Sequence, residues 1–306
     1  MRKLILCATA LASMILAGSC QKDAGQHAGD LAEATFSVDL PAGLSTRAIG
    51  GGTSATELYY GVFTEDGEYL QGLAQAKAVT VQGKTASFKL ALVRNFTYTI
   101  VFWAQAPGAP YTFDPEEGTV TVDYSGYAND ENRDAFCQVH TFTVPDKASF
   151  DQTVYLKRPF AQINFGASDF QPIADLGLGM ESTVTISGLA DTYDILNGTL
   201  SGSASTNLQL STVPAQFDPA ETLTVQGVDY GYVSMNYVLA PANDYQLVNV
   251  AATFAYNNDT VQLDIPNAPM QMNYRTNIVG SFFTDSVSFT IIVDEGFNTP
   301  DNDHIL

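Results

Sequence analysis

The sequence predicts an all-β fold built from two β-sandwich domains. Short runs of β-branched and aromatic residues alternate with polar residues, and the runs end at Gly, Pro, Asn or Asp. Turn signals recur roughly every 8 to 12 residues, which is the spacing found in β-sandwiches. No stretch has the period of an amphipathic helix longer than a few turns. A chain of 306 residues, 45% of them hydrophobic, is long enough for one or two such domains.

The expected strands form two groups of similar size, with a boundary near residues 157–159. The first group comprises residues 35–40, 58–64, 78–82, 86–92, 98–105, 119–124 and 140–144. The second group comprises residues 153–165, 182–188, 193–202, 223–240, 245–256, 259–265 and 286–294. Turn residues at 65–67 and 256–259 favour hairpins there. We therefore expect an N-terminal sandwich over residues 35–158 and a C-terminal sandwich over residues 159–306.

Residues 1–19 have the order of a secretory signal peptide. Arg2 and Lys3 precede an apolar run over residues 4–16, and small residues follow at 17–19. The apolar run is shorter than the ~20 residues that a permanent membrane span needs. We therefore expect residues 1–19 to be removed on export.

Cys20 follows these small residues in the context LAGSC, which predicts a lipoprotein processing site with lipidation of Cys20. Ala17 departs from the commonest form of this motif, which has Leu three places before the cysteine. Several acyl chains would anchor the protein firmly, because each buried CH2 contributes roughly 0.8 kcal/mol. The alternative is simple secretion with a free thiol, which is unfavourable in an oxidising compartment. Residues 20–34 are small and polar, so we expect a flexible tether there.

The cysteine count and the net charge argue against an intramolecular disulfide and against a nucleic-acid partner. Cys7 leaves with the signal peptide and Cys20 is acylated, so Cys137 has no partner for an intramolecular disulfide. We expect Cys137 to be a small buried hydrophobic residue. Processing leaves 11 basic against 33 acidic residues, a net charge of −22. Such a chain has little basic surface for phosphates, so nucleic acid is not an expected partner.

Three segments carry a resemblance to a known group of proteins. Residues 95–105 (NFTYTIVFWAQ), 129–144 (NDENRDAFCQVHTFTV) and 153–165 (TVYLKRPFAQINF) resemble fimbrillin-like lipoproteins of Bacteroidales, which are related to type V pilins. More narrowly, the chain is similar to an uncharacterised-domain family of the DUF6562 kind. The resemblance implies two transthyretin-like Greek-key sandwiches and a lipid-anchored outer-membrane protein at the cell surface. It also implies a structural or adhesive role, with like pilin subunits or other surface proteins as partners.

In polymerising members of that group, an arginine-specific protease removes the first strand, and a strand of the next subunit replaces it. By this resemblance, residues 35–40 are the removable strand, and Arg47, in a glycine-rich stretch, is the candidate proteolytic processing site. The alternative is that Arg47 is an ordinary exposed residue. Residues 286–294 alternate well, but the polar tail after them is short. If it is too short to donate a strand, the protein would be an anchor, a tip or a non-polymerising surface protein.

Lys157 and Arg158 are a rare basic pair in this acidic chain. We expect Arg158 to pair with Asp134 or Glu131 at the domain junction, although a docking contact is the alternative. Phe160, Ile163 and Phe165 are expected in the second core. The single tryptophan, Trp103, is expected in a core because alternating strand aromatics usually pack inward.

The sequence favours neither an enzyme nor a cofactor. Its three histidines are dispersed, and HExxH, GxSxG, P-loop and dinucleotide motifs do not occur. Two acidic loops could bind calcium, although such loops are usually solvated. Their carboxylates belong to Asp114, Glu116, Glu117, Asp130, Glu131 and Asp134. The main rival function is a glycan-binding surface lipoprotein, which would need exposed aromatic residues. The tyrosines that could serve are Tyr59, Tyr60, Tyr230, Tyr232 and Tyr237.

Overall fold

The computed structural model describes residues 30–41, 51–73, 79–125, 130–169, 180–205, 208–210, 222–256, 259–283 and 287–294. These residues are mostly β-strand, joined by turns that include two short 3-10 segments, η2 (Gln71–Leu73) and η3 (Glu131–Arg133). No helix within these ranges is long and apolar enough to cross a membrane. The predicted all-β class is confirmed.

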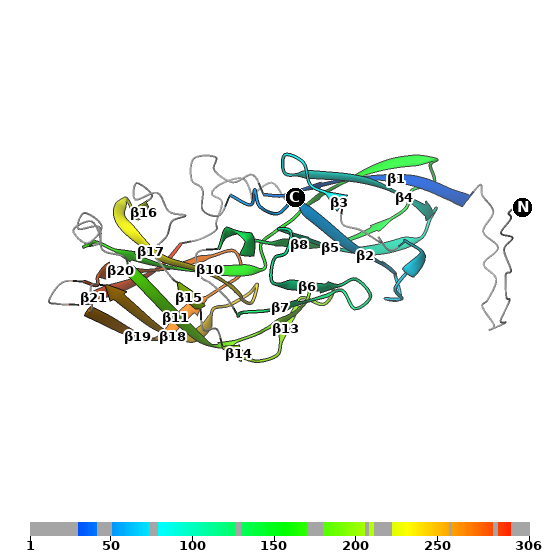
Figure 1. The fold of residues 1–306 in the computed structure, drawn as a ribbon. Coiled ribbons are helices and arrows are strands. Elements are labelled where there is room, and N and C mark those ends of the chain that lie inside the picture. Colours follow the sequence, from blue (N-terminus) through cyan, green and yellow to red (C-terminus); the bar gives the residue numbers. More distant parts are fainter. Residues whose placement is uncertain are drawn as a thin grey trace, which may run out of the picture.

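The N-terminal half stacks three sheets, and they appear as layers in Figure 1. The leader sheet has the order β4 (Thr85–Val93), β1 (Leu31–Asp39), β9 (Ser149–Tyr155). The middle sheet has the order β3 (Val79–Thr80), β2 (Glu57–Thr64), β5 (Thr97–Gln105), β8 (Phe136–Thr143). The bridging sheet has the order β13 (Thr199–Ser201), β12 (Thr192–Asp194), β7 (Thr119–Val122), β6 (Tyr111–Asp114).

Strand β5 explains why three layers form, because it is buried on both faces. Ile100 and Phe102 belong to the core cluster shared with the leader sheet. Val101 and Trp103, which point to the opposite face, belong to the cluster that continues into the bridging sheet and the C-terminal half. A strand apolar on both sides has to be covered on both sides.

The bridging sheet crosses the predicted boundary at residues 158 and 159. Strand β7 comes from the N-terminal half and pairs with β12 of the C-terminal half, with Val120 opposite Tyr193. Tyr124 ties the halves together as well, since its hydroxyl donates to the Ala190 carbonyl and accepts from the Leu239 N–H. The halves therefore share both a sheet and a core cluster.

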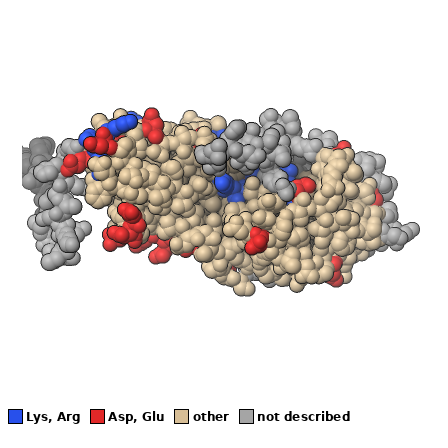
Figure 2. Space-filling view, turned by 180° about the vertical axis from the view of Figure 1, so that it is seen from behind, with Lys and Arg blue, Asp and Glu red and all other residues tan. Residues whose placement is uncertain are grey.

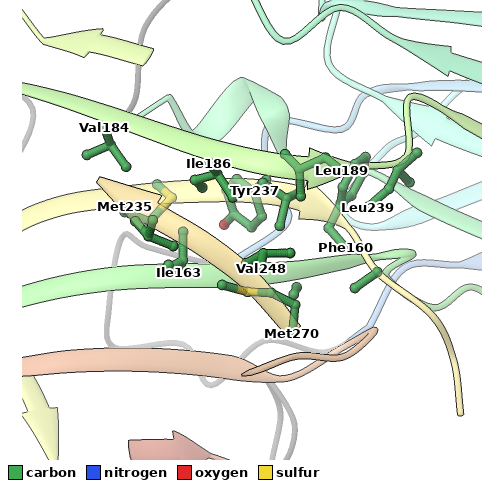
Figure 3. Close-up of a cluster of buried hydrophobic side chains, with 14 of the residues drawn as sticks. Phe160, Ile163, Val184, Ile186, Leu189, Met235, Tyr237, Leu239, Val248 and Met270 are labelled. Carbon is green, nitrogen blue, oxygen red and sulfur yellow. The ribbon is translucent and has the colours of Figure 1, made fainter. Parts of the chain in front are cut away.

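Two sheets pack face to face in the C-terminal half. One has the order β16 (Thr222–Val225), β17 (Val228–Leu239), β10 (Phe160–Ala167), β20 (Arg275–Ser281), β21 (Ser288–Asp294). The other has the order β14 (Ala204–Ser205), β11 (Met180–Leu189), β18 (Gln246–Tyr256), β19 (Asp259–Met270), with β15 (Leu208–Leu210) paired to β11. Figure 3 shows part of their shared core, including Ile163, Ile186 and Val248. Phe165 and Phe254 meet edge to face at 5.6 Å between ring centroids.

The strand boundaries differ from the sequence prediction in several places. The expected strand 193–202 is a hairpin of β12 and β13. Strand β1 begins at Leu31, so the expected tether of residues 20–34 ends earlier; Ala32 and Ala34 are buried but too small to give a clear apolar signal. The expected strand 153–165 divides before Pro159, and its two parts join different sheets. The expected strand 223–240 is a hairpin, because Gln226 and Gly227 both adopt positive φ.

The expected hairpins agree with the structure. β18 and β19 pair down to Tyr256 opposite Asp259. The 65–67 turn closes with the Gly67 N–H donating to the Thr64 carbonyl over 3.0 Å.

Candidate functional site: the groove around the first strand

Strand β1 lies in the middle of the leader sheet although it is the first described strand in the chain. It runs antiparallel to β4, with Phe36 opposite Phe88, and parallel to β9, with Phe36 opposite Gln152. The N-terminal end of the molecule carries this sheet, at upper right in Figure 1. The partner strands come from residues 85–93 and 149–155, so the position of β1 depends on contacts that are distant in sequence.

Alternate side chains of β1 fill a row of apolar positions. Ala32, Ala34, Phe36, Val38 and Leu40 are all buried. The Phe36 ring stacks on Phe88 at 5.2 Å and meets Phe142 edge to face at 5.6 Å. The intervening side chains of β1 are polar and lie on the outer face. The expected removable strand, residues 35–40, therefore supplies part of the core of the N-terminal half.

The main chain of β1 is held at both ends. At the start, the Arg94 N–H donates to the Asp30 carbonyl over 2.8 Å, and the Glu33 N–H donates to the Ala148 carbonyl over 2.9 Å. At the end, the Leu40 N–H donates to the Lys84 carbonyl over 2.8 Å. If β1 left, two facing rows of backbone donors and acceptors on β4 and β9 would lose their partners.

The two expected modification sites, Cys20 and Arg47, lie outside the described residues. The chain is described again from Gly51, close to the junction of the two halves. Gly52 has a positive φ of 63°, and a Cβ there would come within 2.7 Å of the Phe136 ring. The Ser54 hydroxyl donates to the Glu131 carbonyl over 2.8 Å. The stretch that contains Arg47 therefore connects β1 to a segment packed at the junction.

A fully buried ion pair lies at this junction. Arg158 Nε donates to Asp134 Oδ1 over 2.5 Å and Arg158 Nη2 donates to Asp134 Oδ2 over 2.7 Å. Burial alone would lower the pKa of Arg158, but the Asp134 carboxylate holds that pKa above its usual value. Glu131, the other expected partner, accepts a hydrogen bond from the Tyr237 hydroxyl. The expected pairing of Arg158 is thus confirmed with Asp134.

The acidic loops use several of their carboxylates within the fold. Asp114 Oδ1 accepts from the N–H groups of Glu116 and Glu117 at 2.9 and 3.2 Å, and Asp130 caps η3 by accepting from the Asn132 N–H. The described part of the chain contains no group of three or more His, Cys, Asp or Glu side chains that could hold a metal ion.

The candidate sugar-binding tyrosines do not form an exposed platform. Tyr60, Tyr232 and Tyr237 are buried, and Tyr59 and Tyr230 are partly buried against the core. Desolvation and a hydrogen bond to Glu57 raise the pKa of Tyr59 to about 12, which fits a phenol packed into the protein. These five positions give no support to glycan binding.

Cys137 and Trp103 occupy the core positions expected of them. Burial raises the pKa of the Cys137 thiol to about 12, so at pH 8 it stays protonated. We expect a Cys20→Ser form of the mature chain to resist iodoacetamide at pH 8 and to be alkylated at Cys137 after unfolding in urea. Mass spectrometry before and after denaturation measures this, and rapid alkylation of the folded protein would contradict the buried assignment.

The opposite end of the molecule carries an exposed edge strand, β21 (Figure 1). It pairs with β20 on one side, with Phe289 opposite Gly280. Gly280 is required there, because a Cβ would lie 1.9 Å from the Ser288 carbonyl oxygen. Val287 and Phe289 are 48% and 39% exposed, which is high for apolar residues.

Comparison with known proteins finds similar solved structures and one matching family. The chain is similar to the solved structure of a candidate cell adhesion protein from Bacteroides uniformis, with 14% identity, 88% of this chain and 99% of that chain covered, and a TM-score of 0.53. It is also similar to one from Bacteroides ovatus, with 15% identity, 88% of this chain and 98% of that chain covered, and a TM-score of 0.49. A fimbrial assembly protein from Parabacteroides distasonis is also similar, with 14% identity, 87% of this chain and 97% of that chain covered, and a TM-score of 0.44. No curated protein matches. Residues 26–305 match a family described as being of unknown function, DUF6562. The chain therefore belongs to the DUF6562 family, as its resemblance predicted.

Proposed function

We propose that this protein is a pilin-like surface lipoprotein with a structural or adhesive role, held on the outer membrane through acylated Cys20. The observation that supports this best is the position of β1: a strand near the N-terminus lies between two strands in the middle of a sheet. The adhesion and fimbrial names of its structural relatives accord with the proposal.

We further propose assembly by donor-strand exchange. Cleavage after Arg47 would separate β1 from the rest of the chain, leaving it held only by non-covalent contacts. Its departure would open an apolar groove lined by β4 and β9, with their backbone groups unpaired on both sides. A strand with matching side chains can restore both the burial and the hydrogen bonds.

Strand β21 of a second copy has the side-chain order that this groove requires. Residues 36–40 read Phe, Ser, Val, Asp, Leu and residues 289–293 read Phe, Thr, Ile, Ile, Val. At alternate positions both segments offer an aromatic ring, a β-branched residue and an aliphatic residue, so Phe289 would take the place of Phe36. Because β1 and β21 lie at opposite ends of the molecule (Figure 1), repeated exchange would generate an open chain of subunits.

Limited digestion tests this proposal. We expect an arginine-specific protease to cut the soluble part of the mature chain, residues 21–306, once after Arg47, and the product to form oligomers that resist denaturant. Mass spectrometry and gel filtration follow the two steps. Arg47→Ala should abolish the cut, while Phe289→Asp should leave the cut intact and keep the product monomeric.

Two results would count against the proposal. If Arg47 resists the protease, or if the cut chain stays a stable monomer, the polymerising role is lost. An anchor or tip subunit would then be the better account of the surface lipoprotein.

A further inference from the structure

The basic residues of this acidic protein are concentrated beside β1. Residues 84–94, which contain β4, include Lys84, Lys89 and Arg94 and no acidic residue. On the other side of β1, Lys147 and Lys157 flank β9 and are balanced by Asp146 and Asp151, and Asp146 lies 3.7 Å from Arg94. The two segments around β4 and β9 hold five of the 13 Lys and Arg residues of the whole chain.

Strand β1 has the opposite charge. Residues 30–41 contain Asp30, Glu33 and Asp39 and no basic residue. Lys89 Nζ lies 2.6 Å from Glu33 Oε1, and Lys84 Nζ donates to the Pro41 carbonyl over 3.2 Å. An acidic strand therefore lies beside the basic residues of β4 and its ends.

This arrangement contributes little to the stability of the subunit itself. The side chains of Lys89 and Glu33 are 59% and 54% exposed, and exposed ion pairs are weak because water screens them.

The visible Lys and Arg atoms in Figure 2 gather in the upper half of that face, and only acidic residues are coloured along its lower half. Removal of β1 would leave a basic groove on a molecule that is otherwise strongly acidic, which is a means of attracting one kind of strand.

We propose that this groove selects its incoming strand by charge and accepts an apolar strand that ends in a carboxylate, namely residues 287–294 of a second copy. This inference rests on the proposed replacement of β1. When Phe289 takes the place of Phe36, Val293 takes that of Leu40 and Asp294 that of Pro41. The Pro41 carbonyl already lies within hydrogen-bond distance of Lys84 Nζ, so Asp294 would meet an ammonium group there. Glu295 adds further negative charge after Asp294 in the sequence.

Charge also excludes the wrong strands. A strand with the same apolar pattern but with basic flanks would meet Lys84, Lys89 and Arg94 directly, and like charges at close range oppose association. An uncharged strand would fit the apolar positions but would gain no electrostatic attraction. The basic residues of β4 and its ends thus give specificity in addition to the apolar fit.

Peptide exchange measures this selectivity. The mature chain is cut after residue 47, with a site-specific protease sequence inserted there if Arg47 resists. Labelled peptides then compete for the groove with the cleaved N-terminal fragment, which contains β1. The acidic peptide is residues 287–295, and the neutral peptide carries Asp294→Asn and Glu295→Gln. We expect the acidic peptide to associate about tenfold faster at low salt. The advantage should largely disappear in 1 M NaCl, where the screening length falls to about 3 Å.

A matched pair of variants assigns the contact. Lys84→Gln should remove most of the benefit that Asp294 confers, whereas Lys147→Gln, at the other end of the groove, should leave that benefit in place. Equal association of both peptides at low salt would overturn charge selection while leaving strand exchange intact. Failure of both peptides to enter the groove would overturn strand exchange itself, and charge selection with it.

Discussion

Replacement of Asp134 by Asn is expected to lower the free energy of unfolding by about 3–5 kcal/mol, because it leaves the Arg158 guanidinium buried without a counter-charge. Both side chains are almost completely inaccessible, at 0% and 1% exposure. The guanidinium also lies 4.8 Å from the centre of the Phe136 ring, a cation–π contact that cannot replace the lost carboxylate. Urea unfolding followed by circular dichroism measures the loss.

Two controls separate the buried charge from a general loss of contacts. The double variant Asp134→Leu with Arg158→Met removes both charges and should recover most of the stability lost in Asp134→Asn. Glu33→Gln breaks the exposed pair with Lys89 and should change the free energy of unfolding by less than about 1 kcal/mol. A similarly small effect for Asp134→Asn would show that water reaches the Arg158 guanidinium.

Trp103→Ala is expected to lower the free energy of unfolding by a similar amount, about 3–5 kcal/mol, because it leaves a cavity in the core. The indole is fully buried and packs edge to face on Tyr111 at 5.4 Å and on Phe160 at 6.3 Å. Its N–H donates to Gln105 Oε1 over 2.7 Å, so the substitution also leaves that amide without its partner. Because Phe160 begins the C-terminal half, we expect both halves to lose stability together.

Circular dichroism is the suitable probe, since Trp103 is the single tryptophan of the chain. The control is Phe96→Ala, which removes a ring that is 60% exposed and should change stability by less than about 0.5 kcal/mol. If the Trp103→Ala chain unfolds in two separate steps with one of them unchanged, the halves are energetically independent despite their shared core.

The leader sheet shows which structural features the local sequence pattern can predict and which it cannot. The alternation in residues 35–40 predicts a strand with Phe36 and Val38 on its buried face, and the structure agrees. The same pattern says nothing about its neighbours, because the parallel partner β9 is more than a hundred residues away. The exposed tyrosine platform was considered from residue type alone, and burial of Tyr60, Tyr232 and Tyr237 follows from strands that only the fold brings into contact.

The candidate site and the residues around it show the same division between what local pattern predicts and what the tertiary structure decides. Residue type and order alone predicted the pairing of Arg158, the burial of Cys137 and Trp103, and a strand at residues 286–294, because buried charges need partners and apolar residues leave water. The basic residues in β4 and at its ends are visible in the sequence, but their role is not apparent until an acidic strand is known to lie beside them. That signal could have been found by comparing charge between strand candidates.

The amino-acid sequence by itself determined the β class of this protein, two of its hairpin turns and the identity of many core residues, because alternation and turn chemistry act over a few neighbouring residues. Only the tertiary structure decided that β1 lies between β4 and β9, that β7 pairs with β12 across the expected boundary, and that β21 is an exposed edge. The physical reason is that strand pairing is made by backbone groups common to every residue. The choice of partner therefore depends on which apolar faces can be covered at the same time across the whole chain.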